Sequence, residues 1–186
     1  MKKDELLKAC VESISTMGWK DFNFAHVAEE AKIPVSKLYD VFESRSAIPQ
    51  AVIRKIDHDM LLELDGEIFE ESSTRDILFE IIMTRLEVAT PYKRFIEVLW
   101  KEWPADMFSA LMAATQGVGS MGWILDRAGL NTSGLGGVMR LQGLTILYLL
   151  TVKTWLEDDS EDMEKTMSFL DQGLGRVERI AKAMNL

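Results

Sequence analysis

Cysteine, histidine and proline are scarce in this sequence, and their scarcity excludes several kinds of site. Cys10 is the one cysteine among 186 residues, which rules out an internal disulfide and any metal site built from cysteine ligands. The two histidines, His26 and His58, stand far apart on separate predicted helices, so we expect no metal. Four prolines interrupt the chain, and no low-complexity stretch indicates a disordered tail.

The sequence also lacks segments that would direct it across or into a membrane. No apolar run follows the polar start Met-Lys-Lys-Asp-Glu, so we expect no signal peptide and a cytoplasmic location. The longest apolar stretch, residues 144–152, is interrupted by Thr145 and Thr151 and is far shorter than the ~20 residues of a membrane span. We interpret it as part of a buried helix and expect no stable membrane insertion.

Catalytic and cofactor-binding motifs are missing as well. The glycines of residues 134–137 do not form a dinucleotide-binding fingerprint, because Met139 stands in place of the last glycine and no strand precedes them. The acidic cluster at residues 157–162 lacks the spacing and the glycine of a calcium-binding loop. We therefore expect no cofactor and no enzymatic activity.

The net charge of −9 is unevenly distributed along the chain. Residues 1–57 hold nine basic and nine acidic residues, whereas residues 58–186 hold twelve basic and twenty-one acidic ones. An acidic surface repels phosphate, so any binding of nucleic acid must come from the N-terminal part.

Helical periodicity runs through the whole chain, and no alternating segment is bounded by hairpin turns. The pattern predicts an all-α protein of about nine helices, with three short helices, a long fourth helix and further helices after it. We place the domain boundary inside the fourth helix, which gives an N-terminal domain at residues 1–50 and a C-terminal domain at residues 51–186. After a first helix that ends at Gly18, the predicted helices cover residues 24–31, 34–42, 45–64, 74–90, 91–103, 104–127, 134–156 and 160–183.

The strongest motif lies at residues 18–48. Residues 18–31 read GWKDFNFAHVAEEA, and residues 33–48 read IPVSKLYDVFESRSAI. This segment resembles the helix-turn-helix of the TetR family of repressors, since it has the Gly-aromatic turn, the capped helix and the Leu-Tyr-x-x-Phe sequence without a gap. The resemblance implies a three-helix DNA-binding domain followed by a helical domain for ligand binding and dimerisation.

A helix-turn-helix needs small residues where its helices touch, and an apolar face on its recognition helix. Ala28 and Ala31 meet the first need, and the apolar face is formed by Ile33, Leu38 and Phe42. The opposite face then offers four side chains to the major groove of double-stranded DNA, namely Val35, Ser36, Lys37 and Tyr39.

The resemblance also assigns roles to single residues of the motif. It implies that phosphates are contacted by Asn23, Tyr39 and Arg45. Ser36 and Lys37 would approach base edges.

Three residues depart from the family pattern. Asp40 and Glu43 lie on or beside the predicted recognition helix, where carboxylates weaken binding to phosphate. Lys32 stands in the turn where the family usually has glycine. These departures leave open a chain that keeps the fold but no longer binds DNA.

The C-terminal part carries a second resemblance. Residues 155–171 read WLEDDSEDMEKTMSFLD. This stretch is similar to the closing region of the TetR-fold accessory proteins of ubiquinone biosynthesis, which bind lipids. The alternative it implies is a lipid-binding accessory protein of isoprenoid or quinone metabolism.

The middle of the chain is rich in methionine and tryptophan, a combination that suits an adaptable apolar pocket. Ordinary core packing accounts for the same spacing, so the assignment of a pocket depends mainly on the resemblance. The candidate ligand-binding residues are Met83, Phe95, Leu99, Trp100, Trp103, Met107, Met112, Trp123 and Met139.

The predicted helix at residues 134–156 is apolar nearly all round and must be buried on several sides. The chain's own helices and a twofold contact with the last helix of a second copy would cover it. The candidate residues for this homodimer interface are Leu144, Leu147, Tyr148, Thr151, Phe169 and Val177.

The sequence thus predicts a one-component transcriptional regulator, most simply a repressor. A homodimer would bind palindromic DNA, with its two recognition helices one DNA turn apart. An apolar small molecule or lipid in the C-terminal domain would release it.

Overall fold

The computed structural model describes residues 2–66, 72–102 and 117–183, with side chains described from residue 119 in the last range. Every regular element within these ranges is helical, so the prediction of an all-α fold is confirmed. The chain divides into two compact units. Unit 1 comprises residues 1–56 and 89–115, and unit 2 comprises residues 57–88 and 116–186.

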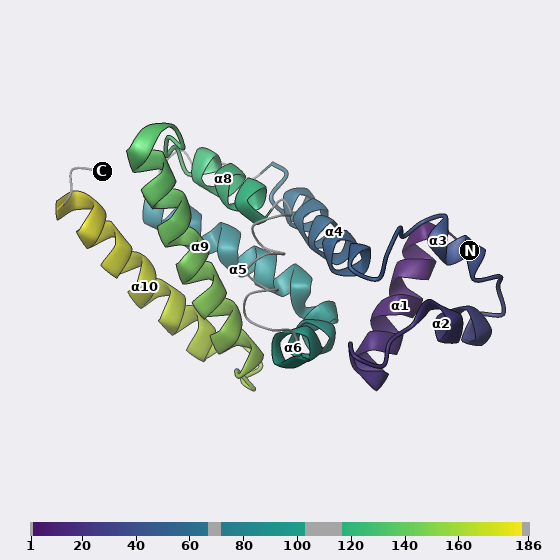
Figure 1. Cartoon of the computed structure of the whole chain (residues 1–186). Coiled ribbons are helices and arrows are strands. Elements are labelled where there is room, and N and C mark those ends of the chain that lie inside the picture. The colour runs from purple at the N-terminus through teal and green to yellow at the C-terminus, as the bar shows by residue number, and fades with distance from the viewer. Residues whose placement is uncertain (1, 67–71, 103–116, 184–186) are drawn as a thin grey trace. The chain divides into compact units, whose positions relative to one another are not determined.

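Unit 1 contains α1 (Lys3–Met17), α2 (Phe24–Glu30), α3 (Ser36–Tyr39), the first part of α4 (Ala47–Glu63), the short 3₁₀ helix η1 (Thr90–Tyr92) and α6 (Lys93–Glu102) (Figure 1). Asp4 and Glu5 occupy the first turn of α1, where negative charge is favourable. Gly18 ends this helix with a φ of 93°, a conformation that glycine adopts without strain. Buried aromatic rings hold the unit together, namely Trp19, Phe22, Phe24 and Phe42.

The helix α6 belongs to unit 1, although the sequence placed it beyond the predicted domain boundary. It packs against α1, and Phe95, Val98 and Leu99 form its buried face. The Glu102 side chain accepts a hydrogen bond of 3.0 Å from the Lys20 backbone N–H, next to the turn at Gly18. The predicted boundary at residue 50 separates a DNA-binding domain from a ligand-binding domain, and it stays a prediction.

Unit 2 contains the end of α4, α5 (Thr74–Ala89), α8 (Gly117–Arg127), α9 (Gly134–Leu156) and α10 (Glu164–Ala183). Figure 1 shows α9 and α10 side by side, with α8 along the other side of α9. A Cβ atom on Gly173 of α10 would lie 2.3 Å from the Leu147 side chain of α9. Glycine at this position therefore permits the close approach of the two helices.

Most of the predicted helix ranges agree with the structure to within a few residues. The range 134–156 is reproduced, whereas the predicted helix 34–42 is a regular helix only over Ser36–Tyr39, with helical turns continuing to Phe42. The first part of the predicted helix 104–127 lies outside the described residues. The last helix begins at Glu164, four residues later than predicted.

The 23-residue helix α9 is long and apolar enough to cross a membrane by length and composition alone. A third of its most apolar window is buried within the unit. The sequence analysis had weighed only the apolar stretch at residues 144–152 as a possible membrane span. Because core helices of water-soluble proteins pass the same test, the feature is weak support for a membrane span.

The junction between α9 and α10 is organised by a buried carboxylate. Asp158 Oδ1 accepts hydrogen bonds from the Ser160 N–H and hydroxyl at 3.1 and 2.6 Å. Asp158 Oδ2 accepts bonds from the Thr166 N–H and hydroxyl at 2.9 and 2.7 Å. Burial alone would raise the pKa of Asp158, but these four hydrogen bonds outweigh it and lower the pKa well below its ordinary value.

Candidate functional site

The helices α2 and α3 form a helix-turn-helix around a tight turn at residues 31–35. Asn23 caps α2 by accepting a 2.9 Å hydrogen bond from the His26 N–H. After α2, the Ile33 N–H donates to the Ala28 carbonyl at 2.9 Å, which closes the turn. Lys32 has a φ of 53°, in the left-handed region. This conformation explains why glycine suits the position, and Lys32 adopts it with some strain.

The outer face of α3 is open to solvent. Leu38 is fully buried beneath it, whereas Ser36 and Lys37 are exposed. Val35 and Tyr39 are large apolar or aromatic side chains that remain 41% and 56% exposed. The four side chains predicted for the major groove therefore all reach the surface of unit 1.

The three residues predicted to contact phosphates are also exposed, and each is held by a neighbour. The Tyr39 ring packs edge-on against Phe24, with ring centroids 5.1 Å apart. The Arg45 guanidinium lies 4.9 Å from the centre of the Trp19 ring and donates to the Trp19 carbonyl at 3.4 Å. The amide oxygen of the third residue, Asn23, is already engaged as the cap of α2.

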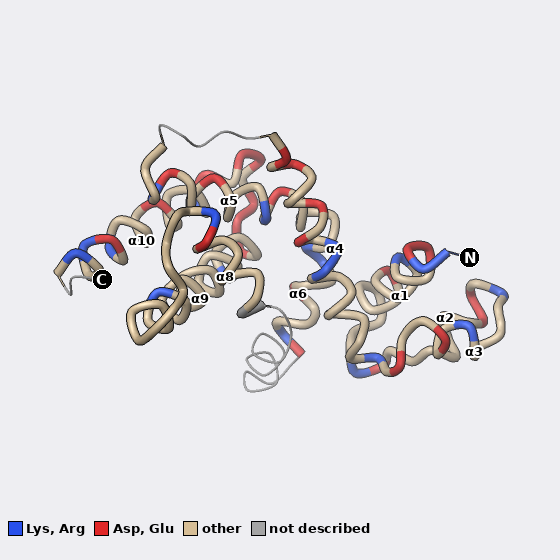
Figure 2. Tube along the Cα trace, turned by 90° about the horizontal axis from the view of Figure 1, so that it is seen from above, with Lys and Arg blue, Asp and Glu red and all other residues tan. Residues whose placement is uncertain are grey.

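Carboxylates share this surface with the basic residues. Asp40, directly after α3, and Glu43, four residues beyond the end of α3, are both exposed. Figure 2 shows acidic and basic residues interspersed along α1, α2 and α3. Unit 1 therefore presents a surface of mixed charge. How much Lys37 adds to DNA binding depends on how close it lies to these carboxylates.

A buried polar network occupies unit 2 and was not predicted from the sequence. Arg85 of α5 is 3% exposed, and its Nε and Nη2 donate to Asp57 Oδ1 of α4 at 3.0 and 2.7 Å. Ser120 of α8 donates to Asp57 Oδ2 at 2.6 Å, and Arg85 Nη1 donates to the Tyr148 hydroxyl of α9. We call these four residues the Asp57 network.

The charge of Arg85 is compensated within this network. Burial alone would lower the pKa of Arg85, but Tyr148 and Asp57 more than offset this effect and raise it. The pKa of Tyr148 is raised, mainly by its burial. One sequence signal was available, because Arg85 stands on the apolar face of α5 between Ile82 and Leu86.

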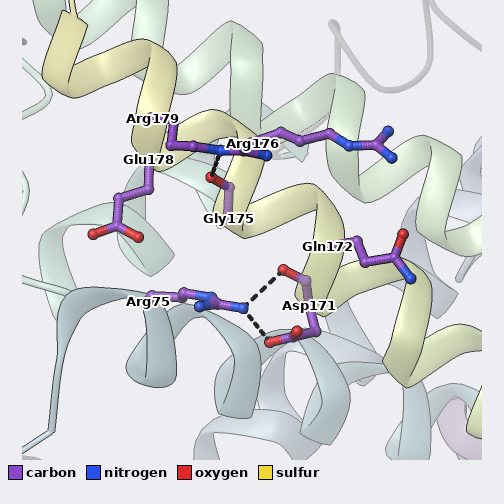
Figure 3. A pocket seen from close by; sticks show the side chains of 7 residues that line it. All are labelled: Arg75, Asp171, Gln172, Gly175, Arg176, Glu178 and Arg179. Carbon is purple, nitrogen blue, oxygen red and sulfur yellow. Dashed lines mark hydrogen bonds and ion pairs between the residues drawn. The ribbon is translucent and has the colours of Figure 1, made fainter.

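A surface groove of about 470 Å³ lies between the start of α5 and the middle of α10 (Figure 3). Arg75 Nη2 donates to a carboxylate oxygen and the carbonyl of Asp171, at 2.6 and 3.2 Å. Arg179 donates to the Gly175 carbonyl within its own helix, and Glu178 is paired with Lys182. These contacts make the groove an ion-paired junction between α5 and α10.

Two solved structures with a similar fold are described as TetR transcriptional regulators. One, from Nitrosomonas europaea ATCC 19718, matches with a TM-score of 0.76 and 18% identity, over 94% of this chain and 96% of that one. Another, from Rhodococcus sp. RHA1, matches with a TM-score of 0.65 and 17% identity, over 93% of each chain. The chain has the TetR fold. No protein-family model and no curated protein matches the sequence.

The second resemblance falls on the junction between α9 and α10. The stretch similar to the ubiquinone-biosynthesis accessory proteins coincides with the Asp158 junction, where Trp155, Asp158 and Thr166 are buried. Its conspicuous residues thus join α9 to α10. The alternative that this resemblance implies, a lipid-binding accessory protein, stays a prediction.

The candidate ligand-binding residues divide between the two units of the TetR fold. Phe95 and Leu99 are buried in unit 1, where Trp100 is half-buried. In unit 2, Met83 is buried on α5 and Trp123 half-buried on α8, while Met139 on α9 is 36% exposed. The other three, Trp103, Met107 and Met112, lie outside the described residues.

The candidate residues for the homodimer interface differ in how exposed their side chains are. Four of them are already buried within unit 2, namely Leu144, Leu147, Tyr148 and Thr151. Phe169 and Val177 on α10 are half-buried. The apolar side chains that α9 exposes are others, namely Leu135, Val138, Met139, Ile146 and Leu150.

Proposed function

We propose that the protein is a DNA-binding transcriptional regulator of the cytoplasm that acts as a homodimer. The observation that carries this proposal is the geometry of α2 and α3. The capped α2, the tight turn and the buried Leu38 hold α3 with Val35, Ser36, Lys37 and Tyr39 exposed on one surface. Such a surface suits insertion into the major groove of double-stranded DNA.

The proposed dimer uses the outward face of α9 together with α10. Ile146 and Leu150 are 59% and 49% exposed and lie one helical turn apart. Phe169 and Val177 provide apolar surface on the neighbouring helix. Exposed apolar side chains such as Ile146 and Leu150 favour a protein partner, and obligate interfaces bury about 2,000 Å² or more. The buried residues named from the sequence would support this face from beneath.

The proposed signal is an apolar small molecule or lipid bound in the C-terminal domain. Such a ligand releases DNA only if it binds one arrangement of the dimer more tightly than the other. Flexible methionine beside tryptophan allows a site of this kind to adapt to its ligand. The likeness to TetR regulators in fold supports this part of the proposal in general terms.

A second candidate function is a lipid-binding accessory protein that has lost DNA binding. The observation that favours it is the exposure of Asp40 and Glu43 within four residues of the end of α3, where they would oppose phosphates. On this proposal, the helix-turn-helix is retained as a structural part, and the apolar C-terminal domain carries the function.

Selection of bound fragments from genomic DNA by the purified protein separates the two proposals. A regulator should enrich a small set of fragments that share a palindromic sequence, and the binding should weaken as salt rises. Organic extraction of the same preparation, followed by mass spectrometry, detects any lipid carried through purification. A protein that retains lipid and enriches no fragment even at low salt supports the second candidate.

A further inference from the structure

The buried side chain of Arg85 has more hydrogen-bond donors than the Asp57 network uses. A guanidinium carries five N–H groups. Nε and Nη2 each donate to Asp57 Oδ1, and Nη1 donates to the Tyr148 hydroxyl. Within the described part of the chain, no acceptor meets the other two N–H groups, one on each Nη atom. Arg85 therefore keeps two unused donors although it is only 3% exposed.

Tyr148 adds a third unused donor at the same point. Its oxygen accepts from Arg85, and none of the described residues accepts from its own O–H. Burial raises the pKa of Tyr148, so the hydroxyl keeps its hydrogen at neutral pH. The two Nη atoms share one carbon, and one of them bonds this hydroxyl. All three donors are therefore grouped around the tip of Arg85.

The side chains next to this tip along the helices are apolar. Ile81 precedes Arg85 by one turn on α5, Leu144 precedes Tyr148 by one turn on α9, and both are buried. Met60, one turn after Asp57 on α4, is buried as well. Buried polar groups in native proteins nearly always have a hydrogen-bond partner. An acceptor for the three donors therefore has to come from outside these side chains, as the oxygen of a bound molecule would.

The charge of the network decides which kind of acceptor fits. The Arg85 guanidinium is already neutralised by the Asp57 carboxylate, at 2.7 Å. A carboxylate or phosphate on a bound molecule would add a further charge without compensation, which is unfavourable in buried surroundings. A carbonyl oxygen brings two acceptor lone pairs, no donor and no net charge. The donors therefore suit a carbonyl group on an otherwise apolar molecule.

The network lies within one compact unit and reaches the protein surface on one side. Its four residues all belong to unit 2. The Asp57 side chain is 20% exposed, whereas the Arg85 side chain is almost completely buried. The exposed edge of Asp57 thus marks the side from which a small molecule could approach.

We propose that the tip of Arg85, together with the Tyr148 hydroxyl, is the polar end of the ligand site in unit 2, and that it binds the carbonyl oxygen of an uncharged apolar molecule such as a ketone, ester or amide. Asp57, which Ser120 holds by a 2.6 Å hydrogen bond, positions the guanidinium and does not contact the ligand. Such a site gives the signal of the proposed regulator a chemical class, and it rests on that proposed function only for its biological purpose.

Three small probes of nearly the same shape test this preference. Acetophenone carries a carbonyl oxygen, ethylbenzene has hydrogens in its place, and benzoate carries a charge. Titrations of the full chain, followed by the NMR signals of each probe, measure the three dissociation constants. Acetophenone should bind at least tenfold more tightly than either of the others, because a site with buried donors rejects a molecule that leaves them unpaired.

Two results with the wild type would overturn the proposal. One is equal affinity for acetophenone and ethylbenzene, or no binding of acetophenone at all. The other is tighter binding of benzoate, which would contradict an uncharged ligand.

The decisive variant is Asp57→Leu with Arg85→Met, which removes the donors of Arg85 and the opposing charge together. Apolar replacement of a buried ion pair is often tolerated. The preference for acetophenone over ethylbenzene should fall below twofold. The matched control is Asp171→Leu with Arg75→Met, the same substitutions at the ion pair between α5 and α10, and it should keep the wild-type preference. A folded variant at residues 57 and 85 that keeps a tenfold preference would refute the assigned site.

Tyr148→Phe decides the matter if the paired variant does not fold. The infrared C=O stretching band of bound acetophenone, labelled with carbon-13 at its carbonyl, reports the donors directly. In the wild type this band should lie at lower wavenumber than in hexane, and it should move in Tyr148→Phe because the set of donors changes. Tyr92→Phe, the same substitution on η1 of unit 1, should leave the band in place. Identical bands in the wild type and Tyr148→Phe would contradict the proposed contact.

These measurements need no DNA, so their failure is separable from that of the regulator function. If selection from genomic DNA enriches no fragment while the carbonyl preference holds, the regulator function is wrong and the binding site stands. If fragments are enriched and the preference is absent, the carbonyl site is wrong and the regulator function stands.

Discussion

Lys37 is the single basic side chain within α3, and it is exposed beside Ser36. If Lys37 reaches a base edge, Lys37→Ala should weaken binding to a selected fragment by about 1–3 kcal/mol and relax its sequence preference. If Lys37 reaches a phosphate instead, the salt dependence of binding should flatten by about one unit of slope. Titrations at several salt concentrations distinguish the two. Lys165→Ala, on α10 of unit 2, is the control that should bind as the wild type does.

Asp40 and Glu43 allow the opposite change at the same surface. The double variant Asp40→Asn with Glu43→Gln removes two negative charges while keeping side-chain size. If α3 faces the duplex, affinity for non-specific DNA should rise, and its decrease with salt should become steeper, because less repulsion opposes the phosphates. Fluorescence titration with a DNA duplex of arbitrary sequence measures both quantities. An unchanged affinity and slope would show that these carboxylates point away from bound DNA.

At the scale of the elements, the Asp158 junction makes a prediction about pH. The pKa of Asp158 is lower in the folded chain than its ordinary value of about 3.9, so the ionised form stabilises the fold. This stabilisation is complete above that ordinary value and is lost as the pH falls through the lower, folded-state pKa. Asp158→Asn should therefore cost about 1.5–3 kcal/mol at pH 7, the range for hydrogen bonds to a charged group, and less below about pH 4.

Chemical denaturation of the wild type and Asp158→Asn at pH 7 and pH 3 measures this difference. Asp159→Asn, at the exposed neighbouring position, is the control and should cost little at either pH. Equal losses in the two variants, or a loss for Asp158→Asn that grows toward pH 3, would contradict the assigned role.

The helices were predictable because each one is specified by residues close together in the sequence. The Asp57 network was not predictable, because its residues lie far apart in the sequence. The apolar spacing bounded residues 134–156 correctly, because the apolar pattern and the polar cluster that follows it lie within one stretch of sequence. Asp57 and Arg85, by contrast, stand 28 positions apart and meet only through packing. Asp158 was visible only as part of a polar break, since its partner Thr166 lies eight residues further along.

The exposed side of α9, proposed as the dimer interface, could not be predicted from the sequence either. Helical periodicity shows that α9 must be buried on several sides, but it does not say which side the chain itself covers. Leu147 is buried against Gly173 of α10, whereas the adjacent Ile146 is 59% exposed. The choice between neighbouring positions depends on how α10 docks, which a pattern within α9 alone cannot report.

At the scale of the whole molecule, adjacent positions on α9 separate association from folding. Ile146→Arg places a charge on the outward face, where the single chain tolerates it and the proposed interface does not. Leu147→Arg places the same charge against α10, where it is buried without a partner and should unfold unit 2. Ile146→Arg should therefore halve the molecular mass in solution while keeping the helical content, and Leu147→Arg should reduce the helical content itself. Sedimentation at micromolar concentration, with circular dichroism on the same samples, measures both. A wild-type protein that sediments as a monomer throughout would remove the dimer, and with it the binding of two half-sites one DNA turn apart.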